Sequence, residues 1–378
     1  MCYKAVSMSD APNDRQGDAP NPPQPPNLPD VLRQLGSLNN LGDLKHLAGQ
    51  IDPEQASAFL RNLVNRGVDN VWDEVAPGVA RLGVVFVNVY AVDAGEGRWY
   101  LIDTGLPGFG GAVKAACERR FDGRPPEAIV LTHAHFDHAG NAESLASAWD
   151  VPVYAHRLEL PYLCGESDYP PGDPTPGGAI SFMSRAFPSR GYDLCGRVQV
   201  LALPEGEDEH AVPGLDGWTW HHTPGHTVGH ISLFRREDAL LIAGDAVATM
   251  DLDSWSEQVK RQPQVCRPAV PFTPDWPSAK ASAETLASLE PRIVAAGHGL
   301  PVRGRNVASE MEHLAATLAP PAHGRYTHEP ATYDTEGRVK TIPPPATDAI
   351  KPKLKFAAGV GLAGVALATF LALRGGRR

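Results

Sequence analysis

The sequence lacks paired cysteines. Its five cysteines, Cys2, Cys117, Cys164, Cys195 and Cys266, are an odd number and include no Cys-x-x-Cys pair. This scatter argues against a disulfide framework and predicts a protein of the reducing cytosol. Residues 1–18 also lack the apolar h-region that a signal peptide needs.

An excess of positive charge is absent as well. The chain has 34 Lys and Arg against 44 Asp and Glu, a formal net charge of −10. This balance gives no reason to expect nucleic-acid binding, and we predict no nucleic-acid partner. Hydrophobic residues make up 42% of the 378 residues, so most of the chain can bury a core as one large domain or two medium ones.

Large apolar residues are scarce near the N-terminus. Residues 10–30 are rich in Pro, Asp and Asn, so we predict a disordered Pro-rich arm over 1–30. Leucines at helical spacing then predict a helical lead-in over 31–71. The same pattern also fits a helix that binds a partner.

The C-terminal part contains a long uncharged run. Residues 319–354 are Pro-rich and polar and predict a linker; 356–373 carry no charge and predict a transmembrane tail helix over 355–374. Eighteen helical residues span about 27 Å, close to the ~30 Å hydrocarbon core. Basic residues flank the run, at Lys351, Lys353, Lys355, Arg374, Arg377 and Arg378. The lysines favour a cytoplasmic catalytic domain, and small residues at four-residue spacing favour a homodimer. A soluble helix, in a soluble cytoplasmic protein, is the alternative.

Residues 72–318 alternate β-rich runs with helical stretches and predict the catalytic domain. Gly95 and Gly97 separate two β-rich runs as a hairpin. Further strands and helices follow, which predicts a layered α/β protein whose sheets are not purely parallel. The region 161–191 is rich in Pro and Gly. Its length favours a lid or a binding loop over a filler segment.

One short stretch, "THAHFDHAG" at 132–140, crowds four metal-competent side chains into six positions: His133, His135, Asp137 and His138. It directly follows the apolar run "AIVL". Neutral imidazole and carboxylate are ligands that suit Zn²⁺, Fe or Mn. A solvated polar turn with chance histidines is a poor explanation for such a density.

Three more residues of this kind follow apolar or β-rich runs. They are His226 in "TPGHTVGH", Asp245 in "LLIAGD" and His298 in "IVAAGH". Open sheets place functional groups at such strand ends. Together with the first stretch they provide five histidines and two aspartates, enough for two metal ions.

The order of "LIDTG", "THAHFDH", "TPGHTVGH", "GD" and "GH" resembles the metallo-β-lactamase superfamily over about residues 72–305. The resemblance implies an αββα sandwich of two mixed sheets with helices outside. It implies one metal held by His133, His135 and His226, and a second held by Asp137, His138 and His298. Asp245 would bridge the two ions, and Asp103 would hold a ligand histidine through a hydrogen bond. His230 is expected to be a packed neighbour of the site.

The resemblance further implies two zinc ions, with iron or manganese as alternatives, and an activated hydroxide oriented by Asp137, which takes its proton. Asp245 favours the glyoxalase II, lactonase and esterase branch, although "GHGLPV" departs from the glyoxalase II pattern. We therefore expect hydrolysis of a small-molecule thioester, lactone or ester. Three alternatives remain: a persulfide-dioxygenase-like oxidoreductase with one iron, a β-lactamase-like amide hydrolase, and a scaffold protein with an inactive site.

Overall fold

A computed structural model of the chain describes residues 67–69, 71–190, 192, 194–201, 210–254, 257 and 262–347. The predicted N-terminal arm, most of the predicted lead-in and the predicted transmembrane helix over 355–374 lie outside the described residues. Within the part of the chain that is described, no helix is both long enough and apolar enough to cross a membrane.

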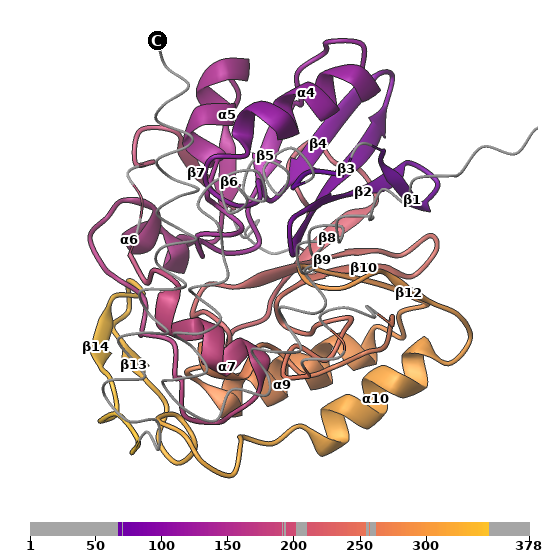
Figure 1. The fold of residues 1–378 in the computed structure, drawn as a ribbon. Helices are drawn as coiled ribbons and strands as arrows, with labels where there is room; N and C mark the ends of the chain where they lie inside the picture. Colours follow the sequence, from indigo (N-terminus) through magenta and orange to yellow (C-terminus); the bar gives the residue numbers. More distant parts are fainter. Residues whose placement is uncertain are drawn as a thin grey trace, which may run out of the picture. The chain divides into compact units, whose positions relative to one another are not determined.

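The first half of the described chain forms a seven-stranded sheet covered by two helices (Figure 1). Strands β1 to β4 pair antiparallel, and β4 to β7 pair parallel. The sheet is therefore mixed. Its strands are β1 Asp73–Ala76, β2 Val79–Val84, β3 Val87–Gly95, β4 Arg98–Ile102, β5 Ala128–Val130, β6 Val153–Ala155 and β7 Val198–Val200. Its helices are α4 Gly110–Arg120 and α5 Ala142–Trp149.

The second half forms a five-stranded sheet in the order β12-β11-β10-β9-β8, with two further helices on its outer side (Figure 1). Only β10 and β11 pair parallel; the other pairs are antiparallel. The strands are β8 Trp218–His222, β9 Ile231–Arg235, β10 Leu240–Gly244, β11 Ile293–Ala296 and β12 Val302–Arg303. The helices are α9 Trp276–Ser288 and α10 Val307–Thr317. The predicted arrangement of two mixed sheets with outer helices is confirmed.

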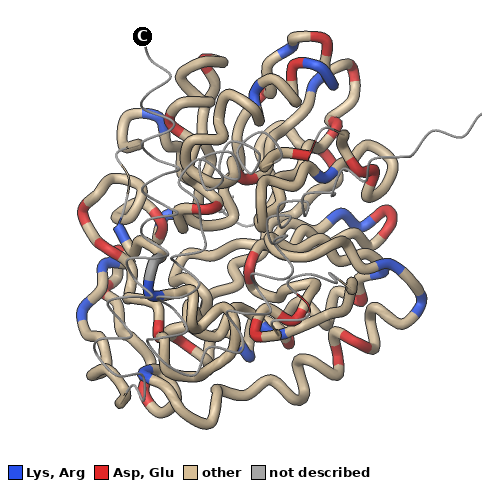
Figure 2. The backbone as a smooth tube through the Cα atoms, in the orientation of Figure 1, with Lys and Arg blue, Asp and Glu red and all other residues tan. Residues whose placement is uncertain are grey.

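Alternating side chains on each strand divide the interior into three apolar layers. On β4, Trp99 and Leu101 pack towards α4 and α5, whereas Tyr100 and Ile102 pack between the two sheets. This follows from the two-residue period of a strand. Lys, Arg, Asp and Glu are spread over the outer helices and loops, with both signs interspersed (Figure 2). Strands β5, β6, β10 and β11 carry none, as expected for strands covered on both faces.

The segment between β6 and β7 is tied down by a disulfide, which corrects the prediction from cysteine spacing. Cys164 and Cys195 are bonded across 31 residues, whereas Cys117 and Cys266 are free. Backbone bonds from Tyr192 N–H to the Tyr162 carbonyl and from Leu194 N–H to the Leu163 carbonyl bring the two ends together. The pairing depends on this tertiary approach, which spacing does not reveal. The segment includes η1 Arg157–Glu159, α6 Leu160–Leu163, α7 Ala179–Met183 and η2 Ser184–Ala186.

The Pro-rich stretch after α10 is not a free linker over its described part, residues 319–347. It forms a two-stranded ribbon, β13 Thr332–Tyr333 and β14 Val339–Thr341. Tyr326 is buried and donates a hydrogen bond to the Pro171 carbonyl at 2.7 Å. Tyr162 donates one to the Gly337 carbonyl at 2.6 Å. Tyrosines that bury their rings and satisfy their hydroxyls anchor a segment that composition alone assigns to a linker.

Candidate metal centre

The seven predicted metal ligands come together at the ends of four strands. His133, His135, Asp137 and His138 follow β5, and His226 lies between β8 and β9. Asp245 directly follows β10, and His298 follows β11 by one residue. Their ligand atoms form three overlapping groups, each within 4.8 Å: His133, His135 and His226; Asp137, His138 and His298; and His133, His138 and Asp245. The first two groups have the same membership as the two sets that the resemblance implies.

The first group consists of three converging imidazoles. His133 Nε2 lies 3.0 Å from His135 Nδ1, which lies 2.9 Å from His226 Nε2. In the second group, Asp137 approaches His298 Nε2 at 3.5 Å and His138 Nε2 at 4.0 Å. Three imidazoles on one side, and two imidazoles with a carboxylate on the other, are donor sets that suit first-row divalent ions.

Asp245 stands between the two groups and contacts both. Its carboxylate lies 3.4 Å from His226 Nε2, 3.5 Å from His138 Nε2 and 3.1 Å from His298 Nε2. The side chain is 5% exposed, so its charge is not screened by bulk water. A carboxylate in this place can offer one oxygen to each side.

Asp103 orients His138, as the resemblance implies. Its Oδ2 accepts hydrogen bonds from His138 Nδ1 at 2.8 Å and from the Thr132 hydroxyl at 2.8 Å, and its Oδ1 accepts one from Thr132 N–H. Because Nδ1 donates to Asp103, Nε2 of His138 faces the cluster and is the nitrogen that can bind a metal once it has lost its proton. Asp103 adopts a φ of 59°, which an L-residue rarely takes. The three hydrogen bonds hold it there.

Two further histidines have a defined orientation. His298 Nδ1 donates to the Phe86 carbonyl at 2.9 Å, which leaves Nε2 for the cluster. His230 accepts from Asp245 N–H through Nε2 at 2.9 Å, and its Nδ1 lies 2.8 Å from the Thr223 hydroxyl. Both nitrogens of His230 are therefore used. These contacts agree with the expectation that His230 is a packed neighbour of the site.

Burial and neighbouring charges shift the pKa values of the histidines in opposite directions, so the histidines differ in protonation. Burial, together with neighbouring imidazoles, lowers the pKa of His135 to about 3 and the pKa values of His133 and His226 well below the usual range. For His298 burial acts in the same direction, but Asp245 and Asp137 together outweigh it and raise the pKa to about 9. The pKa of His138 is likewise raised, chiefly by Asp245 and Asp103. The first group is thus ready to bind a cation, whereas the second must first release protons.

Buried polar atoms with no hydrogen-bond partner among the described residues support a metal. His138 Nε2 and Asp245 Oδ1 are two such atoms: they face each other at 3.5 Å, longer than an ordinary hydrogen bond. Gly297 leaves the space open: a Cβ at this position would lie 2.1 Å from Asp245 Oδ1 and 2.6 Å from His138 Cε1. The donor set, the unsatisfied atoms and the glycine fit a metal ion between these residues.

Glu159 is a buried carboxylate that the sequence analysis missed. Its oxygens accept hydrogen bonds from the Thr227 hydroxyl at 2.7 Å, Gly229 N–H at 2.8 Å and Ala134 N–H at 2.9 Å, and also from the Tyr169 hydroxyl. It thereby joins the loop that carries His133 and His135 to the loop that carries His226. Its sequence signal is a lone acidic residue in the apolar stretch "LELPYL".

We expect Glu159→Gln to lower the melting temperature by roughly 3–10 °C, since an unpaired buried group costs about 1–3 kcal/mol and each kcal/mol shifts Tm by about 2–4 °C. The glutamine amide would face donors in place of an acceptor. Metal affinity should fall by about 10–100-fold. Calorimetric melting and zinc titration test this, with Glu284→Gln on the exposed face of α9 as the matched control. Equal behaviour of the two variants would contradict the role of Glu159.

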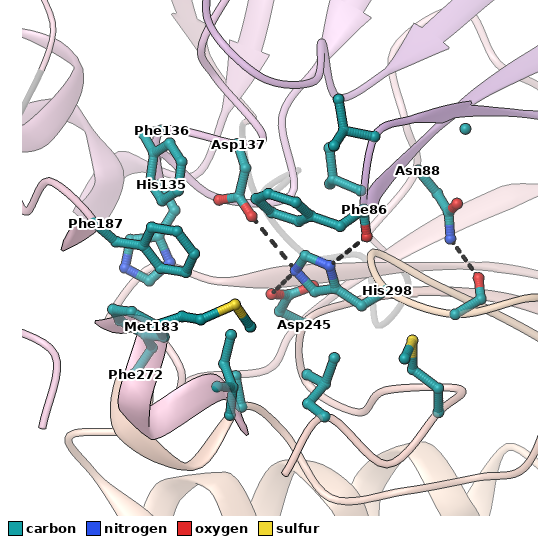
Figure 3. A pocket seen from close by; sticks show the side chains of 18 of the residues that line it. Phe86, Asn88, His135, Phe136, Asp137, Met183, Phe187, Asp245, Phe272 and His298 are labelled. Carbon is teal, nitrogen blue, oxygen red and sulfur yellow. Dashed lines mark hydrogen bonds and ion pairs between the residues drawn. The ribbon is translucent and has the colours of Figure 1, made fainter. Parts of the chain in front are cut away.

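A pocket opens onto the cluster (Figure 3). His135, Asp137, His226, Asp245 and His298 all line it, whereas His133 and His138 are fully buried behind them. No described residue of the lining is a serine, threonine or cysteine. The pocket therefore gives a small molecule access to the candidate metal ligands without offering a side-chain nucleophile.

The chain is similar in sequence to two proteins of Bacillus subtilis. "Probable metallo-hydrolase YflN" of Bacillus subtilis is 41% identical over 250 residues, which cover 65% of this chain and 93% of that protein. "Probable metallo-hydrolase YybB" of the same organism is 27% identical over 202 residues, covering 53% of this chain and 75% of that protein. Among solved structures, a metallo-β-lactamase from Erythrobacter litoralis matches with 18% identity and a TM-score of 0.46, covering 67% of this chain and 98% of that one.

The family described as "Metallo-beta-lactamase superfamily" matches residues 82–298. The match covers more than half of the 378 residues and includes all seven candidate ligands as well as Asp103 and Glu159. The chain therefore belongs to the metallo-β-lactamase superfamily.

Proposed function

We propose that this protein is a hydrolase that holds two metal ions, with zinc as the preferred metal, and cleaves a small ester, thioester or lactone. One observation carries the proposal: two groups of donors lie beside Asp245, whose carboxylate contacts histidines of both, and both groups reach the pocket. A single-metal site needs fewer ligands than these seven. The relatives named as metallo-hydrolases agree with metal-dependent hydrolysis but specify no substrate.

In this proposal His133, His135 and His226 hold one ion, Asp137, His138 and His298 hold the other, and Asp245 reaches both. Such a pair of ions supplies a water of lowered pKa and a Lewis acid for the scissile carbonyl. The remaining requirements fall to the protein: it has to orient the water, move its proton and exclude bulk solvent.

Asp137 is the residue that we assign to the proton. It lines the pocket, and burial raises the pKa of its carboxyl above the ordinary value. Asp137 takes the proton of the attacking water as the new carbon–oxygen bond forms. It then donates that proton to the leaving oxygen or sulfur as the old bond breaks.

Metal content tests the two-metal proposal. We expect about two equivalents of zinc per chain, because seven ligands in two groups are available. Elemental analysis of the full chain purified from zinc-supplied cells measures this. His133→Ala should lower the content, whereas His313→Ala on the exposed face of α10 should not.

One equivalent or less in the metal-replete wild type would contradict the two-metal proposal. If that equivalent were iron and the protein consumed oxygen with a persulfide, the oxidoreductase alternative would replace it. A parallel screen of thioesters, lactones and β-lactams separates the hydrolase alternatives.

A further inference from the structure

One wall of the pocket is apolar and aromatic. It is assembled from five separate parts of the chain: the β2–β3 turn, the residue after His135, the segment around α7, the residues between β10 and α9, and the loop between β11 and β12. The apolar side chains are Val85, Phe86, Val87, Phe136, Ile180, Met183, Phe187, Pro188, Met250, Leu252, Ala269, Phe272 and Leu300. Figure 3 shows Phe136, Phe187, Phe272 and Met183 gathered to one side of His298.

Phe187 is at the centre of this wall. Its ring centroid lies 5.2 Å from Phe136, 5.9 Å from Phe86 and 5.9 Å from Phe272. These are contact distances for aromatic pairs. Phe187 comes from the Pro- and Gly-rich region between Cys164 and Cys195, which the disulfide closes.

The aromatic cluster is continuous with the candidate ligands of both metals. Phe86 stacks on His298 with centroids 5.9 Å apart, and Phe272 meets His135 at 6.0 Å. Phe187 therefore contacts two rings, Phe86 and Phe272, each of which contacts a candidate metal ligand. A group that packs against Phe187 thus lies close to the metal centre. An acyl chain held there would have its carbonyl carbon near Asp137.

The pocket has few positively charged side chains that could bind an anionic substrate. Arg81 is the one basic side chain besides the histidines among the described lining residues. Its Nη1 donates to Asn88 at 2.7 Å, and its Nη2 contacts Asp69 at 3.1 Å and Asp73 at 2.6 Å. Both Nη atoms are thus engaged with side chains of the protein. Asp137 and Asp245 would be neutralised by the metals that they hold, and Asp69 is paired with Arg81. Over its described residues, the apolar wall away from the metal centre therefore offers no free charge to a carboxylate at the far end of an acyl chain.

We propose that the wall around Phe187 is the acyl subsite, and that it selects substrates whose acyl group is apolar and uncharged. This inference rests on the proposed hydrolase function and names the substrate class within it. Each additional methylene of the acyl chain that the wall buries should raise the affinity for the substrate about fourfold, because that methylene leaves water.

Binding tests the subsite independently of turnover. Straight-chain methyl ketones carry the same carbonyl and alkyl chain as a thioester but cannot be hydrolysed. We expect the dissociation constants of the metal-replete full chain for ketones of four to ten carbons to fall by about fourfold per methylene. An ω-carboxylate on the longest chain should weaken binding at least about tenfold, since a charge would lose its water without a partner.

Matched variants locate the effect. Phe187→Ala should bind the longest ketone at least about tenfold more weakly and leave the shortest almost unchanged. Phe187→Leu should recover most of the length dependence. Phe182→Ala is the control, because Phe182 lies on α7 but is not part of the lining. Zinc content, measured on each variant, has to stay that of the wild type.

Turnover is measured on thioesters of one small neutral thiol, with acyl chains of the same lengths. Length-dependent ketone binding that is lost only in Phe187→Ala supports the subsite. Binding without length dependence, or dependence retained in Phe187→Ala, overturns it whatever the turnover. Length-dependent binding without hydrolysis of any thioester, ester or lactone leaves the subsite standing and overturns the proposed hydrolase function.

Discussion

Replacing Asp245 with alanine is expected to lower kcat/KM by roughly a thousandfold or more, beyond the about 10–100-fold typical when a residue that only supports a ligand is changed. The carboxylate lies within 3.5 Å of imidazoles from both groups. Its removal takes the shared charge from both groups at once. His138→Ala should have a similar effect, because the imidazole belongs to two of the three groups.

Asp103→Asn is the informative comparison for these two variants. Asp103 contacts the ligand His138 but is not itself one of the grouped donors, so we expect the smaller loss of about 10–100-fold. All variants are assayed with the thioester series, and circular dichroism shows whether each is folded. Wild-type activity of Asp245→Ala on a substrate that the wild type hydrolyses would refute the bridging role.

Removal of the metals is expected to abolish hydrolysis and to lower the melting temperature by roughly 10 °C. A ligand at a thousand times its Kd stabilises the folded state by about 4 kcal/mol, and each kcal/mol corresponds to about 2–4 °C for a domain of this size. The chelated protein is compared with the same sample after zinc is restored. Full activity in the presence of chelator, with no zinc, iron or manganese left by elemental analysis, would contradict the metal-dependent mechanism.

The same reconstitution should release protons. At neutral pH the raised pKa values of His138 and His298 keep these imidazoles protonated before metal binds. A metal ion accepts only the neutral form, so binding displaces the protons and affinity falls as the pH is lowered. Zinc titration calorimetry in two buffers of different ionisation enthalpy detects the release. Identical heats in both buffers would show that no proton leaves.

The local patterns of the sequence predicted the strands and the ligand cluster well. The hairpin at Gly95 and Gly97 joins β3 to β4, and the histidine-rich stretch follows β5, as expected. Such features depend on neighbours within a few residues, and strand alternation records which faces are buried. The family resemblance assigned the ligands to two sets, and the structure brings the members of each set together.

Features that depend on distant contacts were not predicted. The Cys164–Cys195 bond requires the end of α6 to meet the residues before β7. The role of Glu159 requires two distant loops, one carrying Ala134 and the other Thr227 and Gly229, to present their donors to one carboxylate. Helix α9 was overlooked although Asp275 caps it, its side chain accepting from Ser278 N–H at 3.1 Å. Three of its six buried residues are alanines, whose small side chains give a weak periodic signal.

Each of the two large sheets is built from one uninterrupted portion of the chain, residues 73–200 for the first and 218–303 for the second. The first portion contributes His133, His135, Asp137 and His138, and the second contributes His226, Asp245 and His298. The three-imidazole group and the group that contains Asp245 each draw on both portions. During folding, either layer can therefore form from contacts close in sequence, but neither contains a complete site. The metal centre exists only when the two layers are docked, so metal binding reports that they have docked.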